Sequence, residues 1–186
     1  MINWTFEAGL QTSADIVQVA TDSKKIYDLF SNENVVMTSS SHLSGTDRVN
    51  EAVSKLSLSD EDVVINIQGD EPFINPEDIN NLFDLVSKEE IAMGTLYSEL
   101  KSLDELEDSN KVKILVNDGI ASNFFRETSL VNNIFIHQGV YAFKYKTLKS
   151  FVSWQPSDNE KKYKLEQFRA LDNGIKINAI KSVSKI

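Results

Sequence analysis

The sequence predicts one domain with an α/β layered fold, built around a largely parallel sheet. The chain has 186 residues, which is enough for one domain with a substantial core and too few for two domains of usual size. Hydrophobic residues make up 41% of the chain and charged residues 25%, as in ordinary globular proteins. Short apolar runs alternate with amphipathic segments along the chain, and this alternation is typical of a sheet covered by helices.

The apolar runs predict the strands of this sheet. Each run is short and apolar, and the segment that separates it from the next has a different periodicity. In chain order, we expect strands at residues 16–20, 35–37, 63–67, 111–116, 134–143 and 175–180.

The segments between these runs have the spacing of amphipathic helices. Two of them have clear end signals, because Asn75 can cap a helix that starts with Pro76, and Gly174 can end the last helix. The chain opens directly in a helical segment, whereas such folds usually open with a strand, and it stops soon after the last predicted strand. We therefore expect a sheet that is incomplete at both ends. The expected helices span residues 2–10, 24–30, 47–56, 76–88, 103–107, 146–154 and 160–172.

Charge and composition exclude several classes of protein. The net charge of −9 argues against a nucleic-acid surface, because phosphates require clustered Lys and Arg residues, and here the basic residues are scattered among acidic ones. The chain has no cysteine, which excludes disulfides, thiolate catalysis and cysteine-bound zinc. No apolar run approaches the roughly 18 residues of a membrane span, and the first residues lack the pattern of a signal peptide. We expect a cytoplasmic protein with no membrane or nucleic-acid partner.

The strand predicted at residues 63–67 ends in the stretch QGDEP, residues 68–72. In open α/β sheets, ligands bind beyond the carboxyl ends of the strands, where this stretch lies. Gly69 lets a ligand approach the backbone, and Asp70 offers the hard oxygen ligands that Mg²⁺ prefers. The stretch therefore predicts a metal and phosphate site. The simpler alternative is that Asp70 and Glu71 only solvate a turn before a helix.

Residues 38–48, TSSSHLSGTDR, follow the strand predicted at residues 35–37. Their many small hydroxyl groups, together with His42 and Arg48, offer hydrogen bonds to a polar planar ligand such as a nucleobase. The alternative is a loop that caps a helix, with Thr46 as the N-cap and an acidic residue in the first turn. The sequence alone leaves both interpretations open.

Two further segments place polar residues among apolar ones. On the strand predicted at residues 134–143, His137, Gly139 and Tyr141 share one face and could line a pocket, with Gln138 on the other face. The alternative for this strand is a buried, hydrogen-bonded histidine at the edge of a sheet. The last predicted helix carries polar residues that would ordinarily be solvated or ion-paired, namely Glu166, Gln167 and Arg169.

Seven ordered motifs span most of the chain. They are VATD at residues 19–22, HLSGTDR at 42–48, NIQGDEP at 66–72, NKVKI at 110–114, HQGVYAF at 137–143, WQPS at 154–157 and LEQFRAL at 165–171. QGDEP or SGTDR alone would be modest evidence, but all of them in this order form a specific pattern. In this pattern the chain resembles the family of 3-deoxy-manno-octulosonate (Kdo) cytidylyltransferases, the CMP-Kdo synthetases of lipopolysaccharide biosynthesis.

The resemblance implies a three-layer α/β/α sandwich of the nucleotide-diphospho-sugar transferase type, with a mixed, mostly parallel sheet. It implies the reaction CTP + Kdo → CMP-Kdo + pyrophosphate, in which the anomeric hydroxyl of the sugar attacks the α-phosphorus of CTP. It assigns catalysis and Mg²⁺ binding to Asp70, and it implies a cytoplasmic homodimer with CTP and Kdo as substrates. It assigns CTP binding to His42, Ser44, Gly45, Arg48 and Gln68, and sugar binding to Gln68, His137, Gln138, Tyr141, Glu166 and Gln167.

The chain also departs from the family's pattern. It lacks the segment of the type IPARxxSxRxPGKPL that cradles the triphosphate and the segment of the type GVDTPEDL that supplies a second metal carboxylate, and its stretch after Arg126 is shorter and less basic. A triphosphate with roughly four negative charges would be poorly neutralised on such a chain. We therefore expect a truncated domain, residues 1–186, with weak or no activity. The alternatives are a cytidylyltransferase for a related acidic sugar and a non-catalytic remnant that binds sugar and dimerises.

Overall fold

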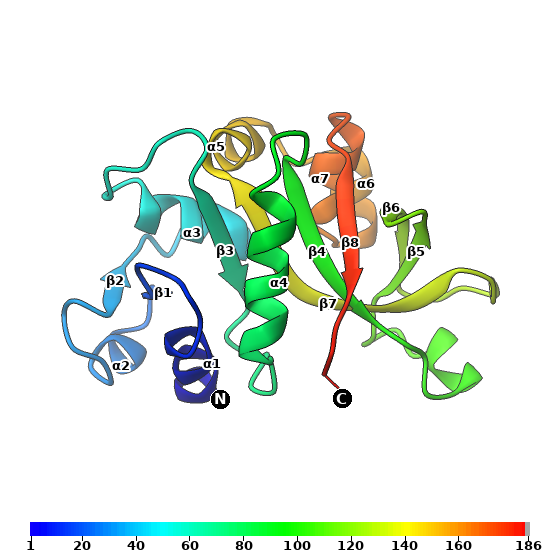
Figure 1. Ribbon diagram of the computed structural model, residues 1–186, viewed down its shortest axis with the longest axis horizontal. Coiled ribbons are helices and arrows are strands. Elements are labelled where there is room, and N and C mark those ends of the chain that lie inside the picture. Colours follow the sequence, from blue (N-terminus) through cyan, green and yellow to red (C-terminus); the bar gives the residue numbers. More distant parts are fainter. Residues whose placement is uncertain (185–186) are drawn as a thin grey trace.

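Two hydrophobic cores lie on the two faces of one mixed sheet. The computed structural model describes residues 1–184, and Figure 1 shows the long strand β7 (Ile134–Lys144) in it. Side chains of β7 contribute to both cores. Tyr141 and Phe143 pack into one core, and Val140 and Ala142 pack into the other, because successive side chains of a strand point to opposite faces. Helices complete both cores, so the expected three-layer α/β/α architecture is confirmed.

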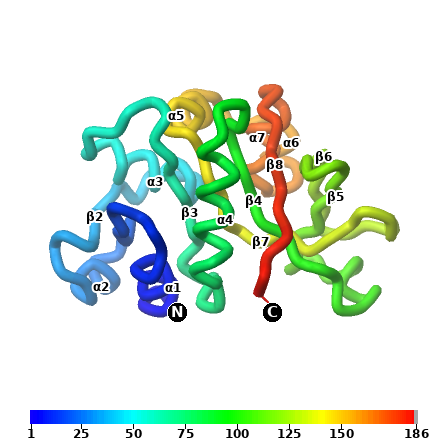
Figure 2. The backbone as a smooth tube through the Cα atoms, in the orientation of Figure 1, coloured from blue at the N-terminus to red at the C-terminus, as the bar shows by residue number. Residues whose placement is uncertain are grey.

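The remaining strands are short. They are β1 (Val19–Thr21), β2 (Val35–Met37), β3 (Val63–Ile67), β4 (Met93–Ser98), β5 (Lys113–Asn117), β6 (Ile120–Phe125) and β8 (Ile177–Lys181). The larger sheet has the order β3-β7-β4-β8-β6-β5, and β1 and β2 form a separate parallel pair. Figure 2 shows β8 beside β4, although the two strands are far apart in the sequence. In this order β3 is an edge strand.

Helices from both halves of the chain cover the sheet. They are α1 (Ile2–Leu10), α2 (Lys24–Tyr27), α3 (Gly45–Val53), α4 (Pro76–Val86), the 3-10 helix η1 (Leu103–Leu106), α5 (Tyr145–Ser153), α6 (Asp158–Tyr163) and α7 (Gln167–Asp172). Helices α1 and α4 contribute to one core, and α5 and α7 contribute to the other. Of the helices within residues 1–184, none is both long enough and apolar enough to cross a membrane.

The sheet is mixed as expected, but its pairings are mostly antiparallel and not mostly parallel. Among the described strands of the larger sheet, β4 and β8 pair in parallel, and every other pair is antiparallel. The reason is the position of β7, which lies between β3 and β4 and runs against both. The sequence pattern does not indicate these pairings, because the alternation of apolar runs and helices does not specify which strand becomes the neighbour of which.

The sequence pattern does not indicate two of the strands, β4 and β6. In β4, Gly94 and Thr95 interrupt the apolar run, although the strand is central and largely buried. Gly94 is needed because a Cβ at this position would lie 2.9 Å from Val86 Cγ2 and 3.0 Å from Leu82 Cδ1. Helix α4 therefore packs directly on the middle of the sheet, and this close contact explains the glycine.

The ends of the helices follow the expected chemistry with one correction. Asn75 caps α4, because its Oδ1 accepts a hydrogen bond from the backbone of the first turn (2.9 Å), and Pro76 follows it. The N-cap of α3 is Ser44 and not Thr46, because Ser44 Oγ accepts the backbone N–H of Asp47 (3.1 Å). Thr46 is instead fully buried in the first turn of α3.

The helix expected at residues 160–172 is divided into α6 and α7. Lys164 ends α6 in the left-handed region, with φ of 55°, and this interrupts the helical path. The chain then starts α7 with Glu166 as its N-cap residue, and Gly174, with φ of 78°, follows the end of α7 as expected. The break matters for function because it places Glu166 and Gln167 at the start of a new helix.

Candidate active site

The carboxyl end of β3 meets two other segments through the side chain of Gln68. A Cβ at Gly45 would lie 2.8 Å from Gln68 Nε2, and a Cβ at Gly139 would lie 3.3 Å from Gln68 Cγ, so both positions favour glycine. Gly45 opens α3, and Gly139 lies in β7. Three stretches that are far apart in the sequence thus converge on one side chain, in the region beyond a strand end where ligands bind in open α/β sheets.

The two carboxylates that follow Gln68 have different environments. Asp70 is exposed, and its carboxylate takes part in none of the hydrogen bonds formed within residues 1–184. Glu71 is partly buried, and its Oε1 accepts the backbone N–H of Gly139 (3.2 Å). Burial raises the pKa of the Glu71 carboxyl, although the hydrogen bond from Gly139 opposes this effect. Glu71 therefore holds β7 against the loop, and Asp70 is the carboxylate that faces solvent.

The surroundings of Asp70 fit a metal ion that arrives with its ligand. In the part of the chain that the structure describes, no group of three or more His, Cys, Asp or Glu side chains could hold a metal. Mg²⁺ usually binds to one or two carboxylates together with substrate phosphates and water. A single exposed carboxylate fits Mg²⁺ bound to a phosphate-bearing molecule, and it does not fit a site made of protein ligands alone.

Two side chains of α3 fix the hydroxyl-rich loop that precedes this helix. Arg48 donates from Nη1 to Thr38 Oγ1 (2.7 Å) and from Nη2 to the Asp22 carboxylate (3.2 Å). Glu51 pairs with the ring of His42, and a hydrogen bond from the loop backbone together with this pairing lowers the pKa of the Glu51 carboxyl. In this structure, His42 and Arg48 bond to groups of the protein itself and so determine the shape of the loop.

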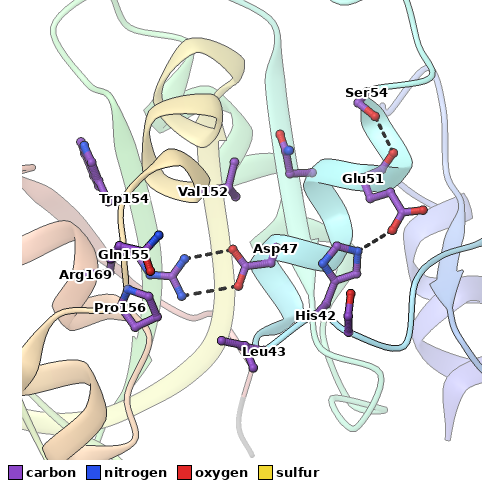
Figure 3. Close-up of a pocket in the computed structure, with 12 residues that line it drawn as sticks. His42, Leu43, Asp47, Glu51, Ser54, Val152, Trp154, Gln155, Pro156 and Arg169 are labelled. Carbon is purple, nitrogen blue, oxygen red and sulfur yellow. Dashed lines mark hydrogen bonds and ion pairs between the residues drawn. The ribbon is translucent and has the colours of Figure 1, made fainter.

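A groove of about 530 Å³ lies between α3 and the segment that follows α5 (Figure 3). Its lining includes His42 and Trp154, and Figure 3 shows the guanidinium of Arg169 facing the carboxylate of Asp47. Arg169 is 2% exposed and pairs with Asp47 (2.9 Å) and with Glu160 (2.6 Å). Arg169 is therefore ion-paired and not solvated, which is one of the two environments that we expect for it. Its ion pairs join α3, α6 and α7.

The polar residues of HQGVYAF lie against α7 and the central strands. The rings of His137 and Tyr141 are 5.4 Å apart, so these residues share a face as predicted. Tyr141 Oη donates to Gln167 Oε1 (3.0 Å), and burial raises the pKa of the Tyr141 hydroxyl. Among the described residues, no group pairs with the buried Nε2 of Gln167 or with either buried amide atom of Gln138. Unpaired buried polar atoms cost free energy, so each of these two amides indicates a position where polar groups of a ligand or water bind.

Glu166 connects the starts of α3 and α7. Its Oε2 accepts the backbone N–H of Thr46 (3.4 Å), and burial raises the pKa of the Glu166 carboxyl. Thr46 Oγ1 in turn accepts a hydrogen bond from Asn66 Nδ2 (3.2 Å) in β3. Glu166 and its buried neighbour Gln167 therefore have neither of the ordinary environments, solvated or ion-paired, because the break after α6 turns both toward the sheet.

Sequence reasoning missed three residues that support the site. Thr95 lies within hydrogen-bond distance of the His137 ring (Oγ1 to Nε2, 2.9 Å), but its strand has no clear sequence signal. Asp22 binds Arg48, and it could have been found by the same signal as Asp70, since it is an acidic residue directly after a strand. Glu71 looked like a solvated turn residue, and only its contact with β7 reveals its role.

Known proteins resemble this chain over most of its length. A sequence model of a family described as cytidylyltransferase matches residues 1–177. The 3-deoxy-manno-octulosonate cytidylyltransferase of Haemophilus influenzae is 35% identical over 198 residues, which cover 96% of this chain and 78% of that protein. The enzyme of the same name from Francisella tularensis subsp. novicida is 35% identical over 193 residues, which cover 95% of this chain and 77% of that protein.

Solved structures agree with these relatives. The structure of CMP:2-keto-3-deoxy-manno-octonic acid synthetase complexed with CTP matches with a TM-score of 0.86 and 29% identity, over 97% of this chain and 78% of that chain. The 2-C-methyl-D-erythritol 4-phosphate cytidylyltransferase of Francisella tularensis matches over 99% of this chain and 79% of that chain with a TM-score of 0.67, and its 15% identity shows the shared fold alone. Sequence and structure therefore lead to one conclusion: the chain belongs to the cytidylyltransferase family, as an enzyme of the CMP-Kdo synthetase type.

Proposed function

We propose that the chain couples CTP to Kdo and releases CMP-Kdo and pyrophosphate. The observation that carries this proposal is the convergence of Gly45, Gln68 and Gly139 beside the exposed carboxylate of Asp70. The names of the curated relatives support Kdo as the sugar, and the similar solved structure, which was determined with CTP, supports the nucleotide.

In this proposal, CTP binds beyond the end of β3. Gly45 has no side chain, so the amide of Gln68 packs closely against the backbone at the start of α3, where we propose that the nucleotide binds. The hydroxyl-rich loop keeps its shape through the contacts of its histidine and of the following arginine. The residues that we propose to bind CTP are His42, Ser44, Gly45, Arg48 and Gln68.

We propose that Asp70 holds Mg²⁺ and is the catalytic carboxylate. When bound, the ion supplies positive charge at the α-phosphate of CTP. Asp70 itself orients the bound nucleotide, because its carboxylate projects from the turn directly after Gln68 and Gly69. Glu71 keeps β7 at a constant distance from this turn through its hydrogen bond to Gly139.

The sugar acid binds, in this proposal, between β7 and the start of α7. The unpaired Nε2 of Gln167 suits a molecule with many hydroxyl groups, because each hydroxyl can donate and accept a hydrogen bond. Binding both substrates side by side brings the anomeric hydroxyl of the sugar to the α-phosphorus, and positioning of this kind lowers the barrier of a reaction between two molecules. The residues that we propose to bind the sugar are Gln68, His137, Gln138, Tyr141, Glu166 and Gln167.

We further propose a single domain over residues 1–186 that works as a cytoplasmic homodimer. We also propose that the polypeptide of 186 residues turns over slowly. Its net charge is −9, and Arg48, the arginine of the proposed CTP-binding set, already pairs with Asp22. A triphosphate would therefore meet weak positive charge from the described residues of this site.

The test is pyrophosphate release by the 186-residue polypeptide with CTP, Mg²⁺ and Kdo, measured beside the Haemophilus influenzae relative. We expect release that requires both substrates and is slower than that of the relative. Faster release with another acidic sugar, such as a sialic acid, would favour the alternative substrate. Binding of Kdo without any release would favour the non-catalytic alternative, and a folded protein that binds neither CTP nor Kdo would contradict the proposal.

A further inference from the structure

The hydrogen bonds of Thr95 determine where His137 carries its proton. The hydroxyl of Thr95 lies 2.8 Å from the carbonyl oxygen of Val140, and a carbonyl can only accept, so Thr95 donates its single proton there. The same Oγ1 lies 2.9 Å from His137 Nε2. Since Thr95 has no second proton to donate, Oγ1 accepts in this contact, and His137 must donate from Nε2. The neutral ring therefore carries its proton on Nε2 and a lone pair on Nδ1.

We propose that Thr95 is a positioning residue for the reaction, and that it holds His137 in the Nε2–H form so that Nδ1 accepts a hydrogen bond from a hydroxyl group of the acidic sugar. This inference rests on the proposed function, because it concerns the proposed sugar side of the site. It assigns His137 the role of a neutral acceptor, and not that of a cation paired with the sugar carboxylate.

The environment of the ring supports this role. Burial lowers the pKa of His137 to about 3, so the ring is neutral at physiological pH. The ring packs edge-on against Phe124, with centroids 5.1 Å apart, and its other neighbour is the ring of Tyr141 at 5.4 Å. These contacts restrict the ring plane, although the residue is not fully enclosed. None of the hydrogen bonds formed within the described residues involves Nδ1.

An irregularity in the sheet brings together the hydroxyl of Thr95, the carbonyl of Val140 and the ring of His137. Between Thr95 and Leu96 the register of β4 against β7 shifts, from Thr95 opposite Tyr141 to Leu96 opposite Gln138. Residues 139 and 140 of β7 therefore have no counterpart on β4. In a regular ladder the carbonyl of residue 140 would not meet a threonine side chain, so the bulge gives the Thr95 hydroxyl its acceptor. Thr95 is fully buried, which keeps water from competing for its hydroxyl.

The direct test is the tautomer of His137 in the 186-residue polypeptide without substrates. Long-range ¹H–¹⁵N correlation spectra of the ¹⁵N-labelled protein distinguish the two ring nitrogens, and the chain has only two histidines, so a His137→Gln variant assigns the signals. We expect the Nε2–H form at neutral pH. A ring that carries its proton on Nδ1 would overturn the inference, and this measurement needs no altered Thr95.

Two variants then connect the tautomer to sugar binding. Thr95→Val keeps the shape of the side chain and removes the hydroxyl, so we expect a mixture of tautomers and a Kd for Kdo that is about tenfold weaker, with the KM for CTP unchanged. Thr95→Ser restores the hydroxyl and should restore both the Nε2–H form and the affinity for Kdo. An altered tautomer with unchanged Kdo affinity would overturn the role of Thr95.

The outcomes separate this inference from the proposed function. A wild-type chain that binds no Kdo would overturn the proposed substrate, and with it the role of Thr95 in sugar binding. A wild-type chain that binds Kdo and turns it over, but carries the proton of His137 on Nδ1, would overturn only the role of Thr95. Calorimetric titration of the 186-residue polypeptide with Kdo measures the binding in both cases.

Discussion

At the scale of single residues, neighbours of the same chemistry have different roles because their surroundings differ. Asp70 and Glu71 are adjacent carboxylates, yet Glu71 accepts a backbone hydrogen bond from Gly139, and Asp70 is exposed. The first arrangement stabilises the fold, and the second leaves oxygen ligands available to a metal. Exposure and hydrogen bonding therefore distinguish a structural carboxylate from a candidate catalytic one.

This difference predicts the effect of Asp70→Asn. We expect turnover that depends on Mg²⁺ to fall at least about 100-fold, because a neutral amide holds the ion poorly. The melting temperature should not change, because Asp70 is exposed. Pyrophosphate release and thermal unfolding check the two parts. Asp84→Asn, at an exposed position of α4, is the matched control, and an equal loss of activity in both variants would remove Asp70 from the metal role.

His137 predicts how stability depends on pH. Burial lowers its pKa from the ordinary value of 6.5 to about 3, so between these values the unfolded chain binds more protons than the folded chain. This contribution to stability is complete above pH 6.5 and is lost as the pH falls toward 3. We expect the free energy of unfolding to decrease more steeply over this range in the wild type than in His137→Gln. Urea unfolding at a series of pH values measures this. An equal pH dependence of the free energy of unfolding in the two proteins would show that the pKa of His137 is not lowered in the folded state.

At the scale of elements, one buried arginine holds three helices in place. Arg169 of α7 pairs with Asp47 of α3 and with Glu160 of α6, and its guanidinium lies over the ring of Phe151 in α5. The start of α3 is also where Gly45 meets Gln68. The ion pairs therefore connect helix packing to the geometry of the candidate active site.

Replacing Arg169 should lower the stability of the fold. We expect Arg169→Met to lower the free energy of unfolding by about 3–5 kcal/mol, because it leaves two carboxylates without their partner in a partly buried place. Lys181→Met is the control, since Lys181 forms an exposed pair with Glu99 and its loss should cost about 0–1 kcal/mol. Urea denaturation of both variants gives the comparison. Similar losses in the two variants would contradict the structural importance of Arg169.

At the scale of the whole molecule, the net charge of −9 opposes the approach of an anionic nucleotide. Acidic and basic side chains form many exposed pairs over the surface, and these contribute little to stability. The excess of acidic residues nevertheless creates a negative field around the protein, and salt screens this field.

This field predicts an unusual dependence on salt. Raising the ionic strength from about 10 mM to about 150 mM shortens the screening length from about 30 Å to about 8 Å, so we expect the KM for CTP to fall. Steady-state kinetics at a fixed excess of Mg²⁺ measures this effect. The KM for Kdo is the internal control and should change less, because the sugar carries a smaller charge. A KM for CTP that rises with salt would mean that local positive charge dominates at the site.

The local elements show how much of the fold follows from the sequence. The strands expected at residues 35–37 and 63–67 and the cap at Asn75 match the structure, because each depends on residues that are neighbours in the chain. The pattern fails at β4, because Gly94 and Thr95 are not the apolar residues that a strand pattern needs. Gly94 allows the close approach of α4, and Thr95 bonds to the ring of His137. It also fails at Lys164, where the left-handed backbone breaks a helix whose periodicity continues.

The sequence by itself determined the layered fold class, most of the helices and strands, and the motifs that identify the family. Only the tertiary structure decided that β7 runs antiparallel between β3 and β4, that Gln68 lies between Gly45 and Gly139, and that Thr95 binds the ring of His137. The physical reason is the range of the interactions. Periodicity and capping act between near neighbours in the chain, whereas these contacts join distant segments, and their energies depend on partners that a local pattern does not encode.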